Sequence, residues 1–242
     1  MKIRILGTGG AINDGLPYNS FIIDEDFLVE TPPDIMNSLF REGINRQAVS
    51  TIYISHFHAD HCFGLPFLLL RNFMDDYSKN IRMIGPEGIE QRVKEICTLA
   101  FGAEHLMQKW IREHITYEEI ENGKEVRIET RYRLIPVKMF HSPETYGFVL
   151  ESDGKKTVYI ADTYWEDSLL EYIKDADTVL IDLNGENSDR VRVHVSEHDL
   201  EQYALPNLKK KNIRFYGTHL KVNKTSKNKN IQYLMPGEEI EV

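Results

Sequence analysis

The chain has 242 residues, and 41% of them are hydrophobic, which is enough for a sizeable core. Its net charge of −9 argues against a general nucleic-acid-binding surface. No apolar run approaches the roughly 20 residues of a membrane helix, and the first residues lack the long apolar region of a signal peptide. Because only two cysteines occur, a disulfide framework is not indicated, and we expect a soluble cytoplasmic protein.

The predicted elements alternate between strands and helices in both halves of the chain. The first half is predicted to contain, in order, a strand before the turn at Gly7, strands at 20–23 and 27–30, a helix at 34–42, a strand at 51–55, a helix from residue 66, a strand at 81–84, and helices at 86–100 and 101–115. The second half is predicted to contain strands at 126–130, 131–140, 147–151 and 156–160, a helix at 168–174, a strand at 178–183, a helix at 196–205, and strands at 213–217 and 231–235. Two mixed halves, each a sheet with helices outside, predict an α/β fold: a four-layer αββα sandwich forming one domain over residues 1–242.

The most informative segment is the motif H-x-H-x-D-H at residues 56–61, directly after the apolar run 51–55. Imidazole and carboxylate groups suit borderline divalent metals such as zinc. His56 and His58 are two residues apart and can point the same way on an extended loop, whereas Asp60 and His61 can face a second point. The spacing therefore predicts two metals on a loop at the C-terminal end of a buried strand. A solvated histidine-rich turn is the alternative.

Four residues cannot complete two metal sites, so further ligands are expected at similar strand ends. His141, Asp162 and His219 each lie just past a predicted strand. With these residues the chain resembles the metallo-β-lactamase-fold hydrolases, whose signature is the HxHxDH loop followed by a single His, a single Asp and a final His. All of these positions are present, and the resemblance covers nearly the whole chain.

The resemblance implies a dinuclear metal site where the sheet edges meet. One metal would be held by His56, His58 and His141, and the other by Asp60, His61 and His219, while Asp162 would bridge both together with a water or hydroxide. Two zinc ions are expected, with manganese and iron as alternatives. Asp60 is also a candidate for orienting the nucleophile.

The residue at position 162 indicates which branch of the metallo-β-lactamase-fold hydrolases the chain resembles. An Asp there is similar to the phosphodiesterase and thioesterase branches, whereas the commonest true metallo-β-lactamases carry a Cys. The interval between His141 and Asp162 leaves room only for a hairpin, while bacterial ribonuclease Z carries a tRNA-binding arm there. Transfer-RNA processing is therefore not favoured.

Two residues outside the ligand set are candidates for catalysis. Ribonuclease Z and the cyclic-phosphate phosphodiesterase of the carbon–phosphorus lyase pathway have a non-ligand His in a place similar to His194, which is taken to protonate the leaving alkoxide. Asp182 would orient that His, as a carboxylate does in ribonuclease Z. A surface or capping role for His194 is the alternative. The resemblance also implies that Glu30 braces the metal loop, and Trp165 is a candidate for lining the pocket.

The resulting hypothesis is a dinuclear metal-dependent hydrolase, a phosphodiesterase acting on a small or nucleotide-type phosphodiester. The alternatives are a thioester or lactone hydrolase on the same metals, and a non-hydrolytic metal-binding or di-iron redox protein. The expected partner is a small anionic substrate; nucleic acid is not favoured and a homodimer stays open. The basic segment 209–229 has no Asp or Glu and either attracts an anionic substrate or is a solvated surface. The loop 184–192 matches no interpretable pattern.

Overall fold

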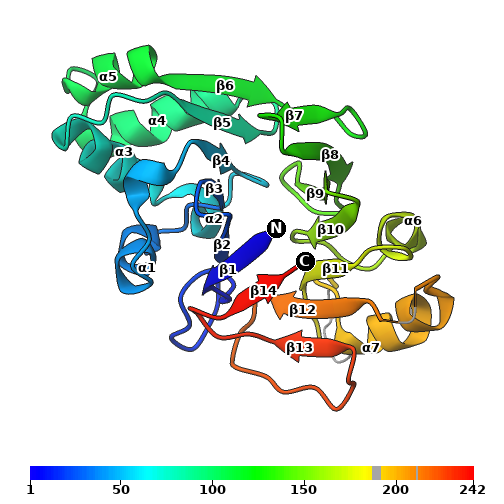
Figure 1. Cartoon of the computed structure of the whole chain (residues 1–242). Coiled ribbons are helices and arrows are strands. Elements are labelled where there is room, and N and C mark those ends of the chain that lie inside the picture. Colours follow the sequence, from blue (N-terminus) through cyan, green and yellow to red (C-terminus); the bar gives the residue numbers. More distant parts are fainter. Residues whose placement is uncertain (187–191, 211) are drawn as a thin grey trace.

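Within residues 1–186, 192–210 and 212–242, which the computed structural model describes, two seven-stranded β-sheets pack face to face between outer layers of helices (Figure 1). This is the expected four-layer αββα sandwich. The loop 184–192 is described only at its ends, and Lys211 of the basic segment lies outside the described residues. Among the described residues, no helix combines the length and the apolar character needed to cross a membrane.

The first sheet is formed by the N-terminal half of the chain and closed by the last strand. Its strand order is β14-β1-β2-β3-β4-β5-β6. The strands are β1 (Lys2–Gly7), β2 (Ser20–Ile23), β3 (Phe27–Val29), β4 (Thr51–Tyr53), β5 (Ile81–Gly85), β6 (Ile115–Glu119) and β14 (Glu239–Glu241).

The second sheet is formed by the C-terminal half. Its strand order is β13-β12-β11-β10-β9-β8-β7. The strands are β7 (Val126–Ile128), β8 (Tyr132–Lys138), β9 (Tyr146–Ser152), β10 (Lys155–Ile160), β11 (Thr178–Asp182), β12 (Arg214–Thr218) and β13 (Ile231–Tyr233).

The helices that cover the first sheet include longer ones than those that cover the second. The first sheet carries α1 (Ile35–Arg41), α2 (Ala59–Cys62), α3 (Leu65–Met74), α4 (Ile89–Phe101) and α5 (Met107–His114). The second carries the shorter α6 (Leu170–Ile173) and α7 (Glu197–Asp199), which a π-helical turn continues through Leu200–Ala204. Short 3₁₀ turns cover Arg46–Ala48, Asp167–Leu169 and Leu205–Asn207. Ser196 caps α7 in a capping box with Asp199, as the sequence predicts.

Two apolar cores hold the layers together. Between the sheets, buried aromatic rings meet edge to face, with centroids 5.1 Å apart for Phe21 and Tyr159 and 5.0 Å apart for Tyr53 and Phe148. A second core lies between the first sheet and its helices. Because apolar cores cover both faces of the first sheet, its central strands are buried on both faces rather than on alternate residues; all three residues of β3, for example, are apolar and buried.

Parallel pairing determines where the polar strand ends meet. Strands β3 to β6 are parallel in the first sheet, and β10 to β13 are parallel in the second. The segments that follow β4, β10 and β12 therefore leave the sheets at their carboxyl edges, where open α/β sheets place their ligands.

Three elements differ from the sequence prediction. Residues 115–119 form strand β6 at the edge of the first sheet, whereas the sequence predicted a helix ending at residue 115 and no strand after it. Asp60 and His61 lie on the short helix α2 rather than on an extended loop. Strand β14 pairs antiparallel with β1, which joins the two ends of the described chain in one sheet.

Both cysteines are expected to resist alkylation in the folded protein. Cys62 and Cys97 are buried, and burial raises the pKa of each thiol to about 12. Since the thiolate is the nucleophile and a raised pKa depletes it, iodoacetamide at pH 8 should modify neither residue in the native state and both in urea. Rapid modification of Cys62 in native protein, detected by mass spectrometry, would contradict this burial.

Candidate metal centre

The segment after β4 places two imidazoles side by side. The ring of His56 is fully buried, and its Nδ1 lies 2.9 Å from the Ser55 hydroxyl. Its Nε2 lies 3.0 Å from Nδ1 of His58. His141, which follows β8, brings its Nε2 within 3.4 Å of the same His58 nitrogen. One nitrogen from each of these three rings could therefore coordinate the same metal ion.

A second group of donors lies beside the first. Asp60 and His61 come from helix α2, and His219 follows β12. Oδ2 of Asp60 lies 3.1 Å from Nε2 of His219 and 3.3 Å from Nε2 of His61. All three side chains are buried, so their donors are shielded from bulk water.

Asp162 lies between these two groups. Its carboxylate oxygens lie 3.1 Å from Nε2 of His219, 3.5 Å from Nε2 of His61 and 4.0 Å from Nε2 of His141. It also shares a potential ligand cluster with His56 and His61. One carboxylate can therefore reach donors of both sets.

Burial sets the protonation state of the first group. Burial lowers the pKa of His56 well below its ordinary value, and the neighbouring His61 lowers it further. Burial likewise lowers the pKa of His141. Both rings are therefore neutral at pH 7, and the neutral imidazole is the form that binds metal ions.

Negative charge dominates the second group. Burial alone would raise the pKa of Asp162, but His219 and His61 hold it well below the ordinary value. Burial alone would lower the pKa of His61, but the carboxylates of Asp162 and Glu30 raise it well above the ordinary value. The group therefore favours bound positive charge, which a divalent cation supplies as well as a proton does.

Orphaned polar atoms show that the donors fit a metal ion. Nε2 of His61 and Oδ1 of Asp162 are buried and have no hydrogen-bond partner among the described residues. Unpaired buried polar atoms are rare in folded proteins, and coordination of a metal ion is one ordinary explanation for them. Together with the imidazole-rich donor set, they indicate a divalent metal site.

A histidine–carboxylate pair borders the centre. Nδ1 of His194 lies 2.7 Å from Oδ2 of Asp182, the last residue of β11. The backbone N–H groups of Thr163 and Asn184 donate to the same carboxylate. The His194 ring lies 5.0 Å from the ring of His219, centroid to centroid. The pair is therefore oriented beside the metal donors, with Nε2 on the side of the ring away from Asp182.

The family profile of the anti-Pycsar protein Apyc1 matches residues 1–239. The chain belongs to the Apyc1 family. Among curated proteins, the ribonuclease Z of Picrophilus torridus is 27% identical over 154 residues, which cover 62% of this chain and 47% of that protein. The ribonuclease Z of Lactobacillus delbrueckii subsp. bulgaricus is 29% identical over 133 residues, covering 54% and 40%. This Apyc1-family chain spans about half the length of the curated relatives it matches.

Solved structures establish the fold of this Apyc1-family chain. The short form of human tRNase Z superposes with a TM-score of 0.77 at 16% identity, covering 100% of this chain and 99% of that one. The metallo-β-lactamase-fold protein YhfI from Bacillus subtilis gives 0.77 at 13% identity, covering 99% and 98%. A diphosphatase of the PhnP family gives 0.73 at 18% identity, covering 100% and 97%. The expected metallo-β-lactamase fold is confirmed.

The structure brings all the predicted site residues of this Apyc1-family chain to one edge of the sandwich. They are His56, His58, Asp60, His61, His141, Asp162, Asp182, His194 and His219. Between His141 and Asp162 the chain forms the β9–β10 hairpin, and no arm is inserted there.

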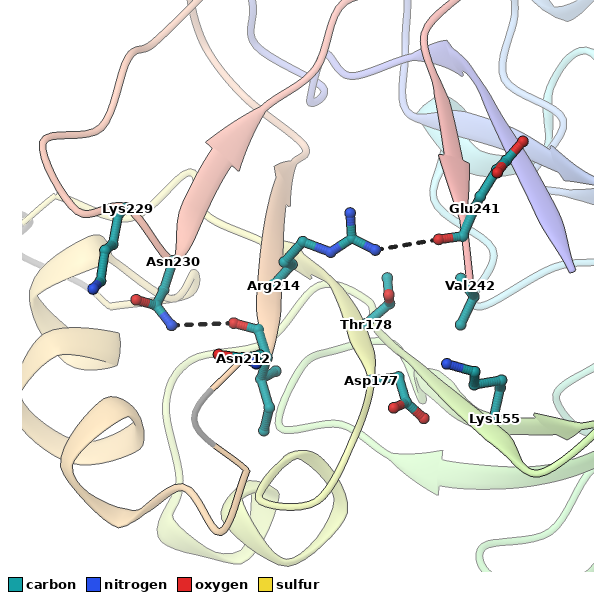
Figure 2. A pocket seen from close by; sticks show the side chains of 10 residues that line it. Lys155, Asp177, Thr178, Asn212, Arg214, Lys229, Asn230, Glu241 and Val242 are labelled. Atoms are coloured by element: carbon teal, nitrogen blue, oxygen red, sulfur yellow. Dashed lines mark hydrogen bonds between the residues drawn. The ribbon is translucent and has the colours of Figure 1, made fainter.

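The basic segment 209–229 is less uniform than the sequence suggests. Arg214 begins β12 and Lys229 precedes β13, so both lie at the opposite ends of these strands from His219. There they line a hollow of about 540 Å³. Figure 2 shows Arg214 in that hollow, where its guanidinium donates to the backbone carbonyl of Glu241 over 3.2 Å. These two cations therefore do not surround the candidate metal centre.

Two supporting residues lie outside the predicted set of site residues. A Cβ on Gly10 would lie 2.8 Å from Nδ1 of His219, so only glycine fits against this ring. Thr163 donates its backbone N–H to Asp182, and its hydroxyl accepts from the N–H of Phe140. The glycine-rich run at residues 7–10 was a signal for the first; no sequence pattern indicates the second.

Glu30 has the contacts expected of a brace. Its fully buried carboxylate accepts from the Ser55 N–H and from the Tyr159 hydroxyl, each over 3.2 Å, and lies 3.5 Å from Nδ1 of His61. Such outer partners fix the orientation of ligand rings.

Substituting Glu30→Gln should preserve the volume but remove the charge that orients His61. Zinc affinity, measured by competition with a chelator, is expected to fall about 10- to 100-fold. The surface variant Glu25→Gln is the control. An unchanged affinity in Glu30→Gln would show that Glu30 does not support the ligands.

Proposed function

We propose that this protein is a dinuclear metal-dependent phosphodiesterase that hydrolyses a small or nucleotide-type phosphodiester. The observation that carries the proposal is the position of Asp162 between two histidine groups with the His194–Asp182 pair beside them. The ribonuclease Z relatives and the similar fold of the PhnP-family diphosphatase support it.

The ligand roles follow from the donor groups. His56, His58 and His141 would hold one ion, Asp60, His61 and His219 the other, and Asp162 both. Zinc suits this donor set best, with manganese and iron as alternatives. When bound, two divalent ions polarise the phosphoryl group and lower the pKa of a water molecule enough for attack near neutral pH.

The remaining residues handle the proton of the leaving group. An alkoxide is a poor leaving group, so hydrolysis of an alkyl diester needs a proton donor. His194 would supply the proton from Nε2, while Asp182 accepts from Nδ1 and holds the ring. Asp60, which reaches His61 and His219, is placed to orient the attacking water. A thioesterase would not need His194, because thiolate leaves well without protonation.

Metal analysis and a substrate panel test the proposal. Purified protein should contain about two metal ions per chain by mass spectrometry, as a dinuclear site requires, and should hydrolyse bis-p-nitrophenyl phosphate. Activity on acyl thioesters or lactones with none on phosphodiesters would replace the proposal with the acyl-hydrolase alternative. Metal binding without any turnover would favour the non-hydrolytic one. Including a tRNA precursor and measuring molecular mass in solution would decide whether nucleic acid or a second copy is a partner.

A further inference from the structure

A hollow of about 340 Å³ adjoins the candidate metal centre. Its lining includes the aromatic side chains of Tyr164, Trp165 and Tyr203, together with Arg192 and His194. This volume lies in the range of small-molecule sites, which are typically lined by aromatic groups with a few polar ones.

His194 forms the boundary between the hollow and the metal centre. Its ring lies 5.0 Å from that of His219 and 6.3 Å from that of His141, centroid to centroid. Tyr164, which lines the hollow, is also close to the candidate metal ligands. It follows Asp162 by two residues, and its ring lies 5.6 Å from that of Phe140, the neighbour of His141.

Two aromatic rings from separate segments, the loop after β10 and the turn after α7, lie together in this hollow. The rings of Trp165 and Tyr203 are nearly parallel, with an interplanar angle of 17° and centroids 6.4 Å apart. Trp165 Nε1 donates to Asp167 over 3.1 Å, which fixes the direction of the indole. Tyr203 lies on the π-helical turn after α7 and is 47% exposed. A partly exposed aromatic pair offers a planar ligand area to stack against at little cost in side-chain entropy.

We propose that this hollow is the leaving-group subsite and takes a planar ring carried by the leaving alcohol, with Trp165 and Tyr203 as specificity-determining residues. The inference rests on the proposed function. In that reaction water adds to phosphorus, the bond from phosphorus to the leaving oxygen breaks, and that oxygen keeps the electron pair and takes the proton of His194. The leaving group must therefore lie on the His194 side, where the hollow begins. The proton that the water loses restores His194 through solvent, so the products are a phosphomonoester and an alcohol.

Binding of two monoesters to metal-loaded protein tests the subsite without turnover. Phenyl phosphate and methyl phosphate share the phosphate that binds the metals and differ in the ring. By calorimetry, wild-type protein should bind phenyl phosphate about 10-fold more tightly, the size expected of one aromatic stacking contact. Trp165→Leu and Tyr203→Leu should each reduce this preference to less than about 3-fold while leaving the affinity for inorganic phosphate unchanged.

Controls separate the subsite from the rest of the molecule. Phe40→Leu, an aromatic change at an 88% exposed position on α1, should keep the full phenyl preference. The two test residues lie on separate segments of the chain, so if one variant misfolds the other still decides the test. An unchanged preference in both variants, each of which still binds inorganic phosphate, would overturn the subsite.

The outcomes for the two proposals can be told apart. Hydrolysis of bis-p-nitrophenyl phosphate combined with an unchanged phenyl preference in both variants would remove the subsite and keep the phosphodiesterase. A phenyl preference that depends on Trp165 in a protein that cleaves no diester would keep the ring site and remove the phosphodiesterase. Wild-type protein that shows no phenyl preference and cleaves no diester would overturn both.

Discussion

Replacing Asp162 by alanine is expected to lower kcat/KM for phosphodiester hydrolysis by about 1,000-fold or more, since dinuclear stabilisation of the transition state is worth several kcal/mol. Asp162 is the carboxylate whose oxygens reach His61, His219 and His141, so its loss removes the shared anion between the two donor groups. Metal content should fall from about two ions toward one or none, because two close cations need that anion to offset their repulsion. Mass spectrometry of dialysed protein and initial rates on bis-p-nitrophenyl phosphate measure both effects.

A matched control is available on the same half of the molecule. Asp175 forms an ion pair with Lys156, and its own side chain is 48% exposed. Asp175→Ala should therefore leave metal content and kcat/KM near wild-type values. Full hydrolysis by Asp162→Ala with two ions still bound would mean that the metal donors are assigned wrongly.

Replacing His194 by alanine should affect substrates according to their leaving groups. For alkyl diesters, loss of a general acid is expected to cost about 100- to 10,000-fold in kcat. For p-nitrophenyl esters, whose leaving group departs without protonation, the loss should be less than about 10-fold. Asp182→Asn should show the same dependence in weaker form, because it removes the charge that orients Nδ1 of His194. Rates across esters of graded leaving-group pKa measure the difference in slope.

The control for His194 lies four residues further along the chain. His198 is exposed on α7, and His198→Ala should leave the leaving-group dependence unchanged. Equal losses for alkyl and p-nitrophenyl esters in His194→Ala would argue for a structural role and against proton transfer.

The residues of the candidate metal centre could be predicted from the sequence because they follow predicted strands. His141, Asp162 and His219 each come just after an apolar run, and parallel strands bring such ends to one sheet edge. Their convergence with residues 56–61 could therefore be predicted without coordinates. The short helix carrying Asp60 and His61 could not, because four residues give no helical period.

Other features depend on contacts distant in sequence. Strand β14 has a single apolar residue, Ile240, and exists because it pairs with β1 at the other end of the chain. Strand β6 follows α5 without a break, so no turn signal separates them. The hollow beside His194 combines Trp165 with Tyr203, which no local pattern relates.

The candidate metal donors come from both sheets, so a bound metal ion would also have a structural role. His58, His61 and their neighbours follow β4 of the first sheet, whereas Asp162 and His219 follow strands of the second. Any ion held by both sets is a cross-link between the two halves of the sandwich. It can form only after the halves have docked, and it then opposes their separation by the free energy of metal binding. Thermal unfolding should therefore shift upward with free zinc concentration, and the filled centre would mark chains whose assembly is complete.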